Sequence, residues 1–93
     1  MDDEQIENSI SAFQLVANLG FQDLDHFSTF CRDVHFGFDR FGSTFQRALG
    51  EALMAADLKD KVKIVQVWQS ACYEHQILFR CYMAKVRAEN ALE

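Results

Sequence analysis

An apolar side chain recurs at every third or fourth position through residues 27–52, FSTFCRDVHFGFDRFGSTFQRALGEA. The members of this series are Phe27, Cys31, Val34, Phe38, Phe41, Phe45, Ala48 and Ala52. Their spacing alternates between four and three residues, which is the heptad pattern that packs one helix against another. The pattern predicts a long helix over residues 24–55, and Asp23 or Asp25 can cap its start by accepting backbone N–H bonds.

Two glycines interrupt this apolar series. Gly37 and Gly42 lie inside the predicted helix, where each costs about 1 kcal/mol relative to alanine. Glycines in a helix interior indicate either a kink or a place where another helix approaches closely. The sequence leaves both interpretations open.

The C-terminal part of the chain repeats the helical pattern. Residues 55–60, AADLKD, predict a turn, after which Asp57 can cap a helix over residues 58–90. The apolar stripe of this helix consists of Val65, Trp68, Cys72, His75, Phe79, Tyr82 and Val86. Two helices of about 30 residues, each about 45 Å long, should pack antiparallel when a short turn joins them.

A shorter helix is predicted before this hairpin, over residues 3–19. Its apolar stripe consists of Ile6, Ile10, Phe13 and Ala17. Gly20 can end the helix with a positive φ, and the absence of proline from the chain favours long helices. We therefore predict one all-α domain over residues 1–93, a long antiparallel helical hairpin plus a short N-terminal helix, completed by oligomerisation.

Composition and charge exclude several classes of function. Nine basic residues against 14 acidic ones give a net charge of −5, which leaves no basic stripe for a phosphate backbone, so we expect no nucleic-acid partner. No apolar run reaches about 18 residues, so we expect no transmembrane segment. The acidic start, residues 1–4, is unlike a secretory signal. Three cysteines without framework spacing indicate free thiols and a cytoplasmic protein.

The aromatic content exceeds what a chain of this size easily buries. Nine phenylalanines, two tyrosines and one tryptophan occur in 93 residues, so we expect a homo-oligomer that also binds a protein or a hydrophobic granule surface. The predicted binding and oligomer interface consists of Phe27, Phe30, Phe36, Phe38, Phe41, Phe45, Trp68, Phe79 and Tyr82. The competing interpretation is that the phenylalanine row is core packing between the two long helices.

Histidine and cysteine side chains suggest an alternative, a helical bundle that holds a lipid, haem or metal ion. Cysteine and histidine on adjacent turns of two helices can form a tetrahedral zinc site. Cys31 and His35 have such spacing, as do Cys72 and His75, and Cys81 is the better-placed third ligand in the predicted hairpin. The competing interpretation is that the cysteines are small core residues and that His75 is a hydrogen-bonded core histidine. We expect no metal, because the predicted antiparallel pairing puts Cys72 and His75 roughly 11 Å along the axis from Cys31 and His35. We expect no haem and no other cofactor, and no attachment motif for haem is present.

Catalytic motifs are missing from the sequence. It contains no G-x-S-x-G, no H-E-x-x-H, no glycine-rich phosphate loop and no EF-hand loop. The carboxylates at residues 2–4, 23 and 25 lie at predicted helix starts, where they stabilise the helix dipole. We therefore expect that the protein is not an enzyme. The predicted function is that of a helical association or scaffold module, which self-assembles and binds an apolar protein or granule surface.

Several segments of the C-terminal half resemble a known family. These segments are Phe45–Leu49, Leu53–Asp60, Val65–Gln69, Glu74–Gln76 and Tyr82–Lys85. In that order they resemble the phasin family, whose members coat polyester storage granules in bacteria and carry a small-residue turn followed by a helix with glutamine and aromatic positions. The resemblance covers about half of the chain, residues 45–92. It implies an amphipathic, oligomeric coat or scaffold protein without catalytic residues.

Overall fold

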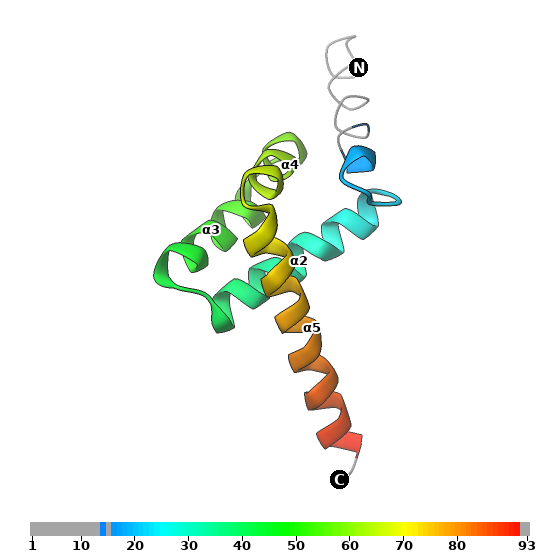
Figure 1. The fold of residues 1–93 in the computed structure, drawn as a ribbon, viewed down its shortest axis with the longest axis vertical. Helices are drawn as coiled ribbons and strands as arrows, with labels where there is room; N and C mark the ends of the chain where they lie inside the picture. The colour runs from blue at the N-terminus through cyan, green and yellow to red at the C-terminus, as the bar shows by residue number, and fades with distance from the viewer. Residues whose placement is uncertain (1–13, 15, 92–93) are drawn as a thin grey trace.

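The fold is all-α, which confirms the predicted class. The structure is a computed structural model that describes residue 14 and residues 16–91, and these residues contain helices and no strand. The helices are α2 (Leu24–Phe41), α3 (Thr44–Ala55), α4 (Leu58–Val67) and α5 (Gln69–Ala91). Figure 1 shows α2 crossed by α5, with α3 and α4 forming the connection between them.

The predicted helix over residues 3–19 lies largely outside the described residues. Residue 14 and residues 16–18 are helical. The chain then leaves the helix at Gly20, whose φ of 91° is the positive value expected of a glycine stop. Asp23 caps α2, because its Oδ1 accepts a hydrogen bond of 2.8 Å from the backbone N–H of His26. Both sequence predictions, the stop and the cap, are confirmed at these positions.

The helix predicted over residues 24–55 is divided into α2 and α3, which corrects the first long helix. Gly42 ends α2, and Ser43 starts α3 through a capping box with Gln46. Oγ of Ser43 accepts from the backbone N–H of Gln46 at 3.1 Å, and Oε1 of Gln46 accepts from the backbone N–H of Ser43 at 3.0 Å. These two reciprocal bonds satisfy donors that a helix start leaves open, so the chain reverses there and α3 returns along α2.

The helix predicted over residues 58–90 bends at Trp68, which separates α4 from α5. The backbone N–H of Trp68 still donates to the carbonyl oxygen of Ile64, and the N–H of Cys72 donates to that of Trp68, both at 2.9 Å. The bend therefore keeps these two helical hydrogen bonds. At the start of α4, Oδ1 of Asp57 accepts from the N–H of Asp60 at 2.8 Å, as the sequence predicts.

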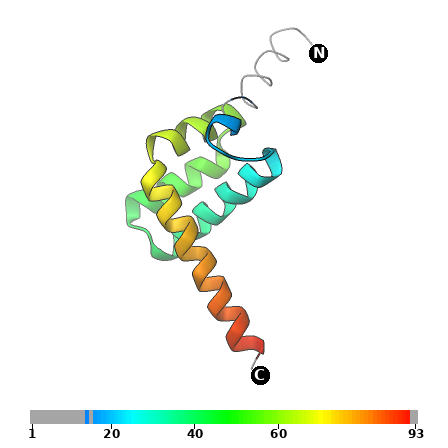
Figure 2. The same ribbon diagram turned by 45° about the vertical axis from the view of Figure 1, so that its right-hand side comes forward.

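The two long segments do not form an antiparallel hairpin. Ring contacts between α2 and α5 join Phe30 to Tyr73, Phe36 to Phe79 and Phe41 to Tyr82. In these contacts the residue numbers of α2 and of α5 increase together. The two helices therefore run in the same general direction where they cross, as Figures 1 and 2 show. The cause is the extra reversal at residues 42–43, which turns the chain once more than the predicted topology does.

The crossing point is at Gly37. A Cβ atom there would overlap the backbone carbonyl oxygen of His75 and would lie 2.8 Å from its carbonyl carbon. Only a residue without a side chain allows α5 to approach α2 so closely. Close approach by another helix is therefore the role found at Gly37, whereas Gly42 lies at the end of a helix and not at a kink inside one.

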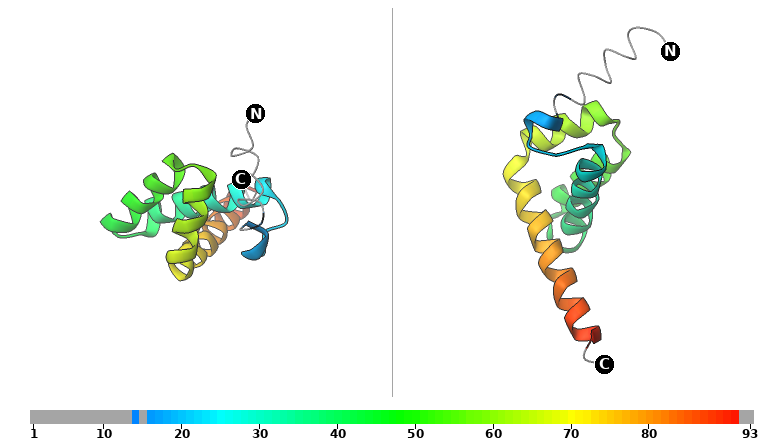
Figure 3. Two further views of the ribbon diagram at one scale, coloured as in Figure 1. Left: turned by 90° about the horizontal axis from the view of Figure 1, so that it is seen from above. Right: turned by 90° about the vertical axis from the view of Figure 1, so that its right-hand side faces the viewer.

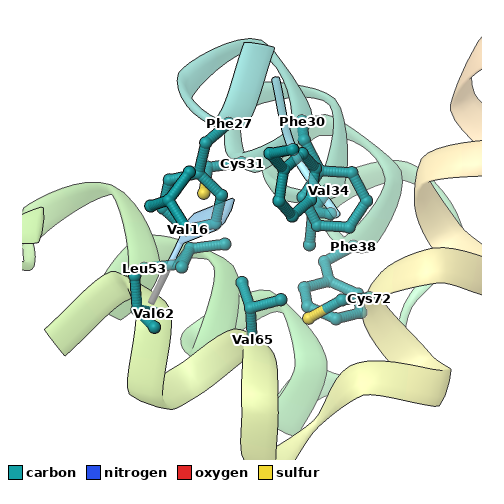
Figure 4. Packing of buried hydrophobic residues seen from close by; sticks show 11 residues of the cluster. Val16, Phe27, Phe30, Cys31, Val34, Phe38, Leu53, Val62, Val65 and Cys72 are labelled. Carbon is teal, nitrogen blue, oxygen red and sulfur yellow. The ribbon is translucent and has the colours of Figure 1, made fainter. Parts of the chain in front are cut away.

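The core gathers residues from every described helix and from the segment before α2. Figure 4 shows ten of its members, labelled, with side chains that point toward one another. The buried apolar residues are Val16, Phe21, Phe27, Phe30, Cys31, Val34, Phe38, Leu53, Val62, Val65 and Cys72. The second half of α5 extends beyond this core, as the right panel of Figure 3 shows. Among the described residues, no helix combines the length and apolarity that crossing a membrane requires.

Candidate functional site

Three of the nine predicted interface residues belong to the core, which corrects the predicted site. Phe27, Phe30 and Phe38 are no more than 5% exposed. The ring of Phe38 lies 4.8 Å from that of His75, and the ring of Phe30 lies 4.9 Å from that of Tyr73. Phe30 and Phe38 pack against α5, and Phe27 packs against Phe21 of the segment before α2, so the three have no surface left for a partner. For them, core packing is the observed role.

The other six predicted residues form three aromatic pairs at the surface. Each pair joins two elements: Phe36 with Phe79, Phe41 with Tyr82 and Phe45 with Trp68. The ring centroids are 5.3, 5.9 and 5.2 Å apart, respectively, within the range of favourable aromatic contacts. Pairing covers part of each ring.

The exposure of these rings is large for their size. Phe36 is 42% exposed, Phe41 44%, Phe45 56% and Trp68 40%. Phe79 and Tyr82 are half-buried. Other apolar side chains add to this surface, namely Met54, Val67, Ile77 and Leu78. Exposed apolar surface of this extent is typical of a site that associates with a partner.

Trp68 and Val67 stand at the bend between α4 and α5. Val67 is 72% exposed, the largest value among the exposed large apolar residues. A shallow depression of about 420 Å³ follows the bend and is lined by residues 66–71. The edge-to-face contact of Phe45 with Trp68 places this bend beside the start of α3. The bend therefore presents two aromatic rings and an aliphatic side chain together.

An arginine covers one face of the second pair. The guanidinium carbon of Arg40 lies 4.0 Å from the ring centroid of Tyr82 and 6.0 Å from that of Phe41. A cation over an aromatic face is held by the quadrupole of the ring. Tyr82 is therefore shielded by its own chain on that face, and Phe41 is the more available member of its pair.

A groove of about 700 Å³ lies between α2 and α5. Phe36 and Phe79, the first aromatic pair, form part of its apolar lining together with Met83. Charged side chains also line it: Arg32 and Asp33 from α2, and Arg80 and Arg87 from α5. The remaining lining residues are His26, Thr29, Phe30 and Gln76.

Sequence reasoning missed this arginine lining. Arg80 and Arg87 are seven residues apart with Met83 between them, which is a signal that they share one face of a helix. Arg32 lies on the other helix, so its place in the same groove follows only from the crossing of α2 and α5. The predicted antiparallel hairpin would have paired α2 with the last helix in the opposite direction.

The five candidate metal ligands do not converge. Within the described part of the chain, no group of three or more His, Cys, Asp or Glu side chains is placed to hold a metal ion. Cys31 and Cys72 are buried free thiols, whereas Cys81 is exposed. Burial raises the pKa of the Cys31 thiol to about 12 and that of Cys72 to about 11. Thiolates, the form that binds metals, are therefore disfavoured at both positions.

The two remaining candidates, His75 and His35, have separate environments. His75 is buried, and its Nδ1 lies 2.9 Å from the carbonyl oxygen of Ala71, which makes Nδ1 the donor in that bond. His35 is half-buried beside Gly50 of α3, and its Nδ1 has no hydrogen-bond partner. His35 is half-buried because α3 folds back against it.

The surface as described offers apolar contact, aromatic stacking and charge-assisted hydrogen bonds from arginine. These are means of binding, and they lie on three elements whose relative positions are fixed by the core. Comparisons of the chain with protein-family models, with curated proteins and with solved structures found no match.

Proposed function

We propose that the protein is a non-enzymatic helical association module, which self-assembles and binds an apolar surface of a protein or storage granule. The observation that carries this proposal is the division of the aromatic residues. The core is already filled by Phe21, Phe27, Phe30 and Phe38, while four further aromatic rings are at least 40% exposed.

The energetic reason is the free energy of leaving these rings in water. Burying a phenylalanine side chain fully contributes about 1.5–3 kcal/mol, and Phe41 and Phe45 leave 44% and 56% of that surface uncovered. A partner that covers several such rings gains this contribution without reorganising the core. The likeness of residues 45–92 to phasins supports a granule or a similar apolar body as one such surface.

The test combines native mass with binding to an apolar particle. We expect size-exclusion chromatography with light scattering to give a multiple of the chain mass. The double variant Phe41→Gln/Phe45→Gln should shift this mass toward the monomer and weaken co-sedimentation with polyester particles. Because both side chains are exposed, the helical content of this variant, measured by circular dichroism, should change little.

The matched control is Phe41→Leu/Phe45→Leu, which keeps apolar side chains at both positions. It should retain most of the assembly and most of the particle binding. A wild-type chain that stays monomeric at every concentration tested, and that leaves polyester particles bare, would contradict the proposed function.

A further inference from the structure

We propose that the groove between α2 and α5 binds an amphipathic helix of a partner protein, with acidic residues along the edge of that helix that faces α5. This inference rests on the association function proposed above, and it adds the chemistry of the partner. Four observations support it: the apolar floor, the spacing of the arginines, the open form of the groove and its charge.

The apolar floor provides the contact area. Phe36 from α2 and Phe79 from α5 meet at 5.3 Å between ring centroids, and Met83 continues the surface along α5. Phe36 is 42% exposed, and the other two are half-buried. Two aromatic rings and a flexible thioether suit the apolar stripe of a helix, because methionine adapts its shape to the side chains that it meets.

The arginines on α5 repeat at the period of a helix. Arg80 and Arg87 flank Met83 at spacings of three and four residues, so they lie on one face of α5 about 10.5 Å apart along its axis. Both line the groove and both are exposed. Two acidic side chains placed seven residues apart on a docked helix would face them in register, and each guanidinium can bind a carboxylate in a bidentate manner.

The form of the groove favours a helix over an enclosed small molecule. Pockets for small molecules surround most of the ligand surface, whereas this groove is open to solvent between two crossing helices. The second half of α5 extends past the other helices, as Figures 1 and 3 show. The α5 side of the groove therefore continues beyond the end of α2, and a third helix can lie alongside α5 there.

The charge of the groove is opposite to that of the chain. Three arginines and one aspartate line it, whereas the whole chain carries a net charge of −5. The α2 wall is mixed, because Arg32 and Asp33 adjoin one another, and the α5 wall carries only arginines among its charged lining residues. Charge complementarity selects partners and orients them, so the acidic edge of the partner belongs on the α5 side.

The experiment uses two synthetic peptides and the full chain. Both are fluorescein-labelled 18-residue helices with leucine at every third and fourth position, one with glutamate and one with lysine along a single edge of the stripe. Fluorescence anisotropy at low salt should show that the chain binds the glutamate peptide about tenfold more tightly than the lysine peptide. Arg80→Glu/Arg87→Glu should reverse this preference.

The control is Lys85→Glu, which changes the same charge on the same helix outside the groove lining. It should leave the affinity for the glutamate peptide within about twofold, since rim charges away from the contact contribute little. Circular dichroism should be unchanged in all variants, because Arg80, Lys85 and Arg87 are exposed. An equal loss in the Lys85→Glu variant would overturn the proposal, since the preference would then reflect overall charge.

Other occupants give different results. If Arg80→Glu/Arg87→Glu lowers the native mass of the chain, a second copy occupies the groove and the proposal of a foreign helix is overturned. If the two arginines are needed for binding to anionic lipid vesicles and neither peptide is preferred, the groove binds lipid headgroups instead. The association function is judged separately, because Phe41 and Phe45, which test it, do not line this groove.

Discussion

Lys61 ties the end of α3 to the first turn of α4. Its Nζ donates to the carbonyl oxygens of Leu53, Met54 and Ala56 at 2.9, 3.2 and 2.6 Å. The last carbonyl groups of a helix have no partner within the helix, and a cation there also meets the negative end of the helix dipole. An ammonium group has three donors, and all three are used.

We expect Lys61→Met to lower the free energy of unfolding by about 1–2 kcal/mol, because methionine keeps the apolar stem and loses the three donors. Lys63→Met is the matched control, since Lys63 is exposed on the same helix, and it should change stability by less than about 0.5 kcal/mol. Urea unfolding followed by circular dichroism measures both. Equal effects of the two substitutions would show that the carbonyl contacts contribute nothing.

Gly37 gives a second prediction for a single residue. Alanine has the better helix propensity by about 1 kcal/mol, but its methyl group would overlap the backbone of His75. Since a backbone cannot rotate away as a side chain can, overpacking should prevail, and we expect Gly37→Ala to lose about 2 kcal/mol of stability. Asp39→Ala, at an exposed position of the same helix, should be nearly neutral. A Gly37→Ala protein with a raised urea midpoint would contradict the close crossing.

The boundary between α2 and α3 is held by one capping box. Ser43→Ala removes the oxygen that accepts from the N–H of Gln46, so we expect a loss of about 1 kcal/mol. Amide hydrogen exchange at Gln46 should accelerate as well. Thr44→Ala removes a hydroxyl one position later, outside the box, and should leave the exchange rate of Gln46 unchanged. If both variants accelerate it equally, the box does not fix the start of α3.

The helix ends were predictable from the sequence where they depend on neighbouring residues alone. The helix before α2 ends at Gly20, which has a positive φ, and α2 and α4 are capped by Asp23 and Asp57, as the local sequence predicts. The signal for the break at Ser43 was also present, as a serine followed three residues later by a glutamine. The prediction of one long helix followed the unbroken heptad spacing of the phenylalanines and did not use this signal. In the structure the residues with that spacing belong to two helices, α2 and α3.

The inward face of α3 could not be predicted from the heptad series for the same reason. After the reversal at residues 42–43, Phe45, Ala48 and Ala52 of the series are exposed, while Gly50 and Leu53 are buried. A turn between two helices resets which positions face the core. Six members of the predicted interface lie at the surface, and their separation from the three core members follows only from tertiary packing.

At the level of the whole molecule, the three thiols differ in their exposure to solvent. Cys81 is exposed, whereas Cys31 and Cys72 are buried with raised pKa values, chiefly because burial disfavours the thiolate. We expect Ellman's reagent to modify one thiol per chain in the native protein and three in guanidinium chloride. A Cys81→Ser chain should give none under native conditions. Rapid reaction of three thiols in the native protein would contradict the closed core.

These thiols also give the molecule a dependence on alkaline pH. Their ordinary pKa of 9.0 is raised to about 12 and about 11 on folding, so the unfolded chain releases protons that the folded chain keeps. Their contribution to stability is therefore complete below pH 9 and falls as pH rises from about 9 toward 12. The Cys31→Ala/Cys72→Ala variant, compared in urea titrations at pH 7 and pH 10, should lose less stability than the wild type between these values.

The same-direction crossing of α2 and α5 has a consequence for biosynthesis. The partners of Phe30 and Phe38 in the last helix, Tyr73 and His75, are more than 35 positions downstream. During synthesis, α2 therefore leaves the ribosome before the last helix, which supplies these partners of Phe30 and Phe38. During that interval the face of α2 that α5 later covers is exposed, which favours aggregation of the nascent chain.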